Sequence, residues 1–292
     1  MTRVRACLFA SLSVALTAIA GRAEATPAVW TAHGAQATAV LFGSVHLLPR
    51  GVDWKPEALT QALAHADEIW FELPIDQTTD AEAVRLTRVA GLWPKSDNLF
   101  NHLSAGETAR LRDVCARLGI STDEVAPLRP WLADVTLSLI DDARHGAAPS
   151  QGVEEQVQDA TPPGARRRAF ETPAQQIALL ARASMADQLA SLDESLEELA
   201  DDPDAYQRVV GEWMAGDLAG LAKDAIEPIE RASPALYRRL IADRNQRWAA
   251  VLARRLTGKG IIVVVVGAGH LIGPEGVPAL LRARGVRVDG PQ

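Results

Sequence analysis

The stretch IIVVVVGAGHLIGPEGVPALL, residues 261–281, decides how this chain folds. Six β-branched residues run directly into a glycine-rich turn that contains His270. β-Branched residues favour extended strands, so this stretch predicts a buried strand, a loop and then a helix. TAVLFGSVHLLP, residues 38–49, has a similar form, because an apolar run leads into Gly43 and His46 follows three residues later. The chain therefore carries Gly-x-x-His twice, each time after a strand-like run.

The N-terminus predicts a secretory signal. Arg3 and Arg5 give a basic start, an uncharged apolar stretch follows, and AEA at residues 23–25 has the small-x-small pattern of a signal-peptidase site. The apolar stretch is short and no second one follows, which favours a cleaved signal over a membrane span. We expect residues 1–25 to be removed and the mature protein to be periplasmic or secreted, with no membrane partner. An uncleaved N-terminal anchor is the alternative.

The composition limits the classes of partner and the means of stabilisation. Basic and acidic residues are mixed along the chain, the net charge is −7, and no basic stripe indicates a nucleic-acid partner. Cleavage of the signal leaves Cys115 as the only cysteine, so the fold depends on its apolar core and not on an internal disulfide. The remaining length suits one large domain, and we predict a single domain over residues 26–292. The sequence does not indicate an oligomeric state.

Strand and helix patterns alternate along the chain. AVWTA, His33-Gly34 and ATAVLFGSVH predict a β-hairpin, and DEIWFELP and GARRRAFE predict two further strands. Helical patterns fill the middle, and Thr172 with Pro173 predicts the start of a long helix, with helical pattern continuing to Leu256. Further helices are expected near residues 55–66, 79–90, 104–118, 130–143 and 153–160, and the last unit is a strand at 260–266, a helix near 275–284 and a short strand, VRV. These patterns predict an α/β fold of mixed α+β character, with a central mixed sheet built from both ends of the chain and a large helical middle region.

Four polar side chains stand at, or just past, the carboxyl ends of predicted strands: His46, Glu72, Glu171 and His270. In open α/β sheets, ligands bind in the crevice outside those ends. Two histidines and a carboxylate commonly bind Zn²⁺, Mn²⁺, Fe²⁺ or Co²⁺ with positions left open for water. Such a metal acidifies bound water and polarises a carbonyl, and a second carboxylate then serves as general base or as a further ligand.

Structural explanations stand beside this metal hypothesis. A histidine in a loop can cap a helix or bond to backbone, and an acidic residue beside a helix start, such as Glu171, is favoured by the helix dipole. The helix expected at 234–256 places Arg244 on a buried apolar stripe, with Asn245 next to it. A buried guanidinium needs a partner. Arg244 therefore either pairs with a structural carboxylate or lies with Asn245 in the crevice, where these residues bind substrate or stabilise an oxyanion.

The sequence also resembles the TraB/GumN family, which includes the animal Tiki proteases. The resemblance covers nearly all of the mature chain and rests on LFGSVHLLP, ADEIWFELP, QGVEEQVQDA with FETPAQQIALL, WMAGDLAGL, RNQRWAAVL and VVVGAGHLIGPEGVPALLRARGVRV. It implies a fold related to erythromycin esterases and haem-binding ChaN-like proteins. It also implies a metal-dependent hydrolase site in which His46, His270 and Glu72 hold the metal, with proteolysis supported by Mn²⁺ or Co²⁺ in the animal branch. Glu171, Arg244 and Asn245 match further motifs of the family.

The leading hypothesis is therefore an exported metal-dependent hydrolase that acts on a peptide or a small molecule. His46, His270 and Glu72 would bind Mn²⁺, Co²⁺ or Zn²⁺, while Glu171 or Glu72 moves the proton and Arg244 with Asn245 steadies the developing charge. The first alternative is a periplasmic haem- or metal-binding protein without catalysis, which needs the histidines but no carboxylate base. The second is an accessory protein whose crevice is vestigial.

Overall fold

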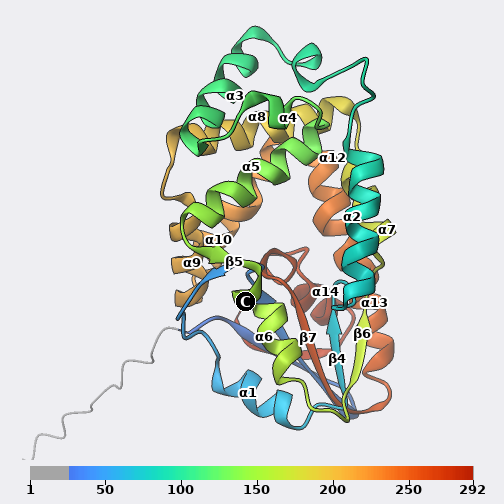
Figure 1. The fold of residues 1–292 in the computed structure, drawn as a ribbon. Coiled ribbons are helices and arrows are strands. Elements are labelled where there is room, and N and C mark those ends of the chain that lie inside the picture. Colours follow the sequence, from blue (N-terminus) through green and yellow to red (C-terminus); the bar gives the residue numbers. More distant parts are fainter. Residues whose placement is uncertain (1–25, 292) are drawn as a thin grey trace, which may run out of the picture.

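The computed structural model describes residues 26–291, so the predicted signal segment, residues 1–25, lies outside the described residues. A six-stranded sheet forms the centre of the fold, in the order β6-β4-β7-β2-β1-β8 (Figure 1). Its strands are β1 Val29–His33, β2 Gln36–Ser44, β4 Glu68–Phe71, β6 Arg166–Ala169, β7 Lys259–Gly267 and β8 Arg287–Asp289. Strands from both ends of the chain thus lie in one sheet, and the predicted mixed α/β class is confirmed.

The direction of the strands determines where their ends meet. β6, β4, β7 and β2 run parallel to one another, whereas β1 is antiparallel to β2 and to β8. β7 and β2 pair along their whole length, from Gln36 opposite Lys259 to Ser44 opposite Gly267. The carboxyl ends of four strands therefore meet at one edge of the sheet, as the sequence predicts.

Alternate residues of the central strands face opposite layers of helix, because side chains alternate along a strand. On one face, Val264 of β7 and Leu41 of β2 pack with Trp248 and Leu252 from the helical layer of α13 Asp243–Arg255 and α14 Val277–Ala283. On the other face, the neighbouring β7 residue Val265 packs against the layer that contains α1 Glu57–Ala64 and α6 Val153–Ala160. The long β-branched run is buried on both faces, which is typical of a parallel strand.

The middle of the chain forms a helical region with an apolar core of its own, centred on Leu111, Leu137 and Leu192. In Figure 1 this region lies above the carboxyl edge of the sheet. The helices of this stretch are α2 Gln77–Gly91, α3 Ala105–Leu118, α4 Thr122–Val125, α5 Pro130–Arg144, α7 Pro173–Ala181, α8 Met185–Asp201, α9 Ala205–Ala215, α10 Leu218–Leu221, α11 Glu227–Ala232 and α12 Pro234–Tyr237. Trp213 of α9 and Leu221 of α10 pack in the core of the sheet instead. A two-stranded ribbon of β3 Leu48–Pro49 and β5 Ala147–Ala148 joins the two regions. Within residues 26–291, no helix is long and apolar enough to cross a membrane.

Two local expectations were wrong. The predicted long helix after Thr172 ends at Ala181, because the Ser184 side chain accepts a hydrogen bond from the Asp187 amide and caps a separate helix, α8. The predicted helix 234–256 is interrupted by a π-helical turn, η4 Arg238–Ala242. A second π turn, η3, spans Ala222–Ile226. The spacing of apolar residues in the sequence does not reveal either π turn. Such turns are frequent at functional sites.

Candidate active site

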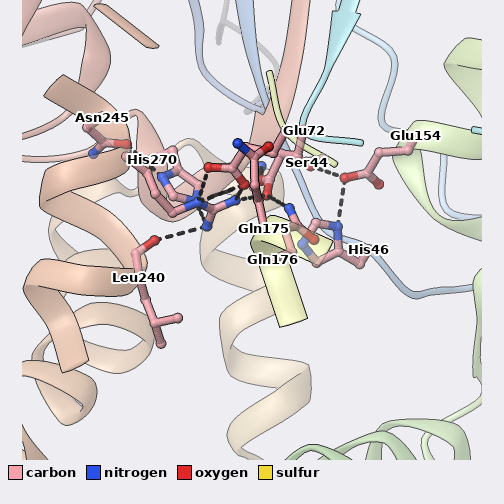
Figure 2. Close-up of polar contacts among 12 residues, drawn as sticks. Ser44, His46, Glu72, Glu154, Gln175, Gln176, Leu240, Asn245 and His270 are labelled. Atoms are coloured by element: carbon pink, nitrogen blue, oxygen red, sulfur yellow. Dashed lines mark hydrogen bonds and ion pairs between the residues drawn. The ribbon is translucent and has the colours of Figure 1, made fainter. Parts of the chain in front are cut away.

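His46 lies just past β2 and is held by a carboxylate from α6. Its Nδ1 lies 2.7 Å from Glu154 Oε1, and Ser44 Oγ donates to the same oxygen at 2.5 Å. The charge of the Glu154 carboxylate, with the hydrogen bond between the two side chains, raises the pKa of His46 to about 9, although the His46 side chain is 63% exposed. In Figure 2 this pair lies on one side of Glu72, and His270 lies on the other. Glu154 thus fixes the ring so that Nδ1 faces the carboxylate, which leaves Nε2 for other contacts.

Glu72 directly follows β4 and accepts three hydrogen bonds. Oε1 accepts from the Gly267 amide at 2.8 Å, while Oε2 accepts from Arg244 at 2.6 Å and from Gln176 at 3.0 Å. Burial opposes ionisation of this carboxyl, but the positive charges of His270 in its protonated form and of Arg244 outweigh it and lower the pKa of Glu72 to about 2. Glu72 is therefore an anion at neutral pH.

Arg244 connects the two acidic strand ends. Its Nε and Nη2 donate to Glu171 at 2.9–3.1 Å, and its Nη2 also reaches Glu72. Nη1 donates to the Leu240 carbonyl, and the guanidinium lies 4.6 Å from the centre of the Trp248 ring. The arginine and Glu171 are both buried, with side-chain exposures of 7% and 5%. Arg244 thus pairs with a buried carboxylate, which was one of the two expectations for it. Arg244 also lines the cavity beside the site, which was the other.

His270 is buried after β7, and its neighbour Asn245 sets its tautomer. Asn245 Nδ2 donates to the Glu275 carbonyl at 2.8 Å, which turns its Oδ1 toward His270 Nδ1, 2.6 Å away. Nδ1 therefore carries the proton, and the lone pair of Nε2 faces Arg244 Nη1 at 2.9 Å. Burial lowers the pKa of His270 to about 4, so the ring is neutral at neutral pH. Figure 2 shows Asn245 and His270 together, apart from His46.

The two histidines and Glu72 converge on Gly267, the last residue of β7. A Cβ atom at Gly267 would lie 3.2 Å from Glu72 Oε1, 3.5 Å from His46 Nε2 and 3.7 Å from His270 Cδ2. The missing side chain thus leaves a small space that three predicted metal ligands surround. Glu171 joins from β6, since its backbone amide bonds to the Glu72 carbonyl at 2.9 Å. The structure brings together all six residues that the sequence singled out.

These donors suit a divalent ion in kind, although they do not form a ready-made cage. Metal-binding histidines usually hold one ring nitrogen against an acceptor, and His46 and His270 both do so. Across residues 26–291, however, no three His, Cys, Asp or Glu side chains are close enough to hold a metal as they stand. At this site Arg244 contacts both His270 Nε2 and Glu72 Oε2. An ion would compete with this guanidinium for two of its three ligands.

Sequence reasoning missed three side chains of the site: Ser44, Glu154 and Gln176. Glu154 lies in the first turn of α6, far from any strand end, so the rule that located the other residues did not apply to it. Glu154 and Gln176 both lie inside stretches that carried the family resemblance, QGVEEQVQDA and FETPAQQIALL. The adjacent pairs Glu154-Glu155 and Gln175-Gln176 were the features of the sequence that could have pointed to these side chains.

One family model covers the segments that carry these residues. The model of the TraB/PrgY/gumN family matches residues 28–290, which is nearly the whole chain. The chain belongs to the TraB/PrgY/gumN family. No match was found among curated proteins or among solved structures. In this TraB/PrgY/gumN protein, both Gly-x-x-His motifs and the acidic strand end lie within the matched residues, as does nearly all of the chain.

Proposed function

We propose that this protein is an exported hydrolase that binds a divalent metal ion and cleaves a peptide bond. The observation that supports it best is the convergence of His46 Nε2, Glu72 Oε1 and His270 around Gly267. Export rests on the N-terminal sequence pattern alone. Family membership is compatible with this activity and does not by itself specify it.

The residues divide into ligands and groups that orient them. His46, His270 and Glu72 would hold the ion, and Glu154 and Asn245 would orient the two imidazoles. When bound, the ion supplies Lewis-acid chemistry, which acidifies water and polarises a carbonyl. Glu72 has a low pKa, so it suits the role of ligand better than that of base.

Arg244 supplies positive charge where a carbonyl oxygen would become negative. It lines the cavity with His46 and His270, and preorganised donors in such a position stabilise an oxyanion. Glu171 uses both of its oxygens to hold the guanidinium. Glu171 is therefore assigned a positioning role, and so is Asn245.

A second candidate, hydrolysis without a metal, is favoured by the His46–Glu154 pair. A histidine with Nδ1 held by a carboxylate and Nε2 directed elsewhere has the geometry of a general base. In this case the neutral form of His46, which becomes substantial only as the pH approaches its raised pKa of about 9, takes a proton from water, and Arg244 again stabilises the oxyanion. The two candidates assign His46 different roles, ligand or base.

Hydrolysis of a mixed peptide pool, followed by mass spectrometry, tests the proposal and separates the candidates. We expect activity in the mature protein, loss on dialysis against a chelator, and recovery on addition of Mn²⁺, Co²⁺ or Zn²⁺. His46→Ala and His270→Ala should be inactive but folded, whereas His65→Ala, on an exposed surface, should be active. Activity that persists after complete metal removal contradicts the metal and favours the second candidate. Absence of hydrolysis by metal-loaded protein contradicts both.

A further inference from the structure

One helical segment presents an apolar stripe to a cavity instead of to the core. The segment consists of the π turn η3 and of α11, which follow each other directly. The cavity has a volume of about 580 Å³, and five apolar residues of the segment line it: Ala225, Ile226, Pro228, Ile229 and Ala232. They recur at intervals of three and four residues, so they share one face of the helix. At the positions between them, Glu227, Glu230 and Arg231 are exposed to solvent.

The protein itself covers this stripe incompletely. All five of its residues are only half-buried, whereas the apolar stripe of a helix in a globular protein normally packs into the core. Trp248 and Leu252 of α13, which do pack in the core, are 2% and 0% exposed. Because removal of apolar surface from water is favourable, a ligand that covers the stripe would gain binding energy from it.

The cavity is continuous with the candidate active site. His46, Arg244 and His270 line it together with the stripe. Ile226 lies against the residue before His270, since a Cβ atom at Gly269 would collide with the Cδ1 atom of Ile226. The glycine thus lets the stripe approach the reacting groups closely. A substrate bound at those groups therefore lies beside the stripe.

A second apolar wall comes from the segments that carry the reacting groups. Ile241 of the π turn η4, three residues before Arg244, lines the cavity, and so does Ile272, two residues after His270. The two π turns η3 and η4 therefore border the same cavity. Since π turns are frequent at functional sites, their position is a reason to assign this cavity to a ligand that does not depend on its apolar character.

The cavity also has an acidic wall. Carboxylates of α5 and α8 line it, as do Asp202 and Asp224. Arg208 bonds to both Asp202 and Asp224, and Arg231 pairs with Glu194 of α8, so these three acids stabilise the helical region. Negative charge around a cavity opposes the binding of an anionic group. The group that binds beside the apolar stripe should therefore be apolar and not acidic.

We infer that this stripe is a specificity subsite for a large aliphatic side chain of a peptide substrate, on a residue next to the cleaved bond. The side chain, of the size of leucine, would pack on Ile226, Ile229 and Ile241, and the peptide bond beside it would lie at the reacting groups. The inference rests on the proposed function for the position of the reacting bond, and on the apolar stripe for the preference.

Three synthetic peptides that differ in one side chain test this inference. Each is a decapeptide of alanine and serine whose central residue is leucine, asparagine or lysine. Asparagine has nearly the shape of leucine but is polar, and lysine tests the acidic wall. Calorimetry measures their affinity for the mature protein and for two variants. Ile229→Asn places an amide on the stripe, and Ala225→Leu fills part of the cavity. Leu139→Asn is the matched control, because Leu139 is exposed on α5 and does not line this cavity.

The wild type should bind the leucine peptide about tenfold more tightly than either of the others, because the apolar stripe leaves an amide or an ammonium without partners. Ile229→Asn and Ala225→Leu should lose this preference while their melting temperatures are maintained, and Leu139→Asn should retain it. Equal binding of the three peptides by the wild type, tighter binding of the lysine peptide, or a preference that survives either substitution on the stripe overturns the inference.

Cleavage of the same peptides, followed by mass spectrometry, tests the proposed function separately. Preferential binding of the leucine peptide without cleavage by metal-loaded protein supports the inference and counts against the proposed hydrolase. Cleavage of all three peptides with equal kcat/KM and equal affinity supports the hydrolase and overturns the inference.

Discussion

His46 Nδ1 lies 2.7 Å from Glu154 Oε1, although the two residues are 108 positions apart in the chain. This contact joins the end of a central strand to a helix that packs on the sheet. Through this contact Glu154, which does not follow a strand of the central sheet, determines which ring nitrogen of His46 faces the site. The pair gives His46 its orientation and its raised pKa, so it provides the first prediction.

Glu154→Gln should lower the pKa of His46 toward its usual value near 6.5, because the largest influence raising it is the charge of Glu154. Activity should fall about 10- to 100-fold, the usual effect of losing a partner that orients a metal-binding histidine. NMR titration of the metal-free protein reports the pKa. Glu155→Gln, on the exposed neighbour, is the control. An unchanged pKa for His46 in Glu154→Gln would contradict this assignment.

Arg244→Met should strongly destabilise the protein. It leaves Glu72 and Glu171 buried without their shared cation, and breaking a buried ion pair in this way costs about 3–5 kcal/mol. Chemical denaturation measures the free energy of unfolding. Addition of Glu171→Gln should recover part of the loss, because one uncompensated charge is removed. A loss below about 1 kcal/mol, the range of exposed ion pairs, contradicts the account of Arg244.

Gly267→Ala should remove metal binding while it preserves the fold. The added Cβ would lie 3.2 Å from Glu72 Oε1 and 3.5 Å from His46 Nε2, so it fills the space between the ligands. The glycine has no positive φ, and alanine therefore meets no backbone strain there. Metal titration and circular dichroism measure the two properties. Gly164→Ala, with open space around its Cβ, is the control. Undiminished metal affinity in Gly267→Ala contradicts the proposed location of the ion.

Because of Glu68, the free energy of unfolding should depend on pH below pH 4.5. Burial opposes its ionisation, but hydrogen bonds from Arg166, Trp70 and Arg255 outweigh it and lower the pKa to about 2. Because the folded-state pKa is below the unfolded value, the contribution is complete above pH 4.5 and is lost as pH falls toward 2. Its size is on the order of 3–4 kcal/mol, since the pKa falls by about 2.5 at about 1.4 kcal/mol per pKa unit.

Unfolding of wild type and Glu68→Gln, measured from pH 7 to 2, checks this contribution. The two stabilities should converge as the pH falls. Glu82→Gln, an exposed substitution on α2, should follow wild type throughout. A difference between wild type and Glu68→Gln that stays constant down to pH 2 contradicts the prediction.

The strands were predictable from the sequence because β-branched runs and glycine turns report local conformation. Parallel pairing of β2, β4, β6 and β7 then brings His46, Glu72, Glu171 and His270 to one edge, as expected. The helix expected near residues 104–118 was also confirmed, as α3 Ala105–Leu118.

Features that depend on tertiary contacts were not predictable. The π turn before Arg244 rotates the apolar stripe, so that Ile241 is buried whereas Leu240 is only partly buried and gives its carbonyl to Arg244. Glu154 approaches His46 from a helix whose position depends on how the layers pack. The hydrogen bonds of Arg244 to Glu72, Glu171 and His270 likewise depend on how segments distant in the sequence pack together. Local pattern therefore located the site, and long-range packing determined its hydrogen bonds.

The number of metal ions bound per chain tests the central claim most directly. Elemental analysis of the mature protein, purified without added chelator, should give one divalent ion per chain, retained in His65→Ala and lost in both His46→Ala and His270→Ala. Equal metal content in wild type and both site variants, with all of them folded, would contradict the claim that the two imidazoles share one ion.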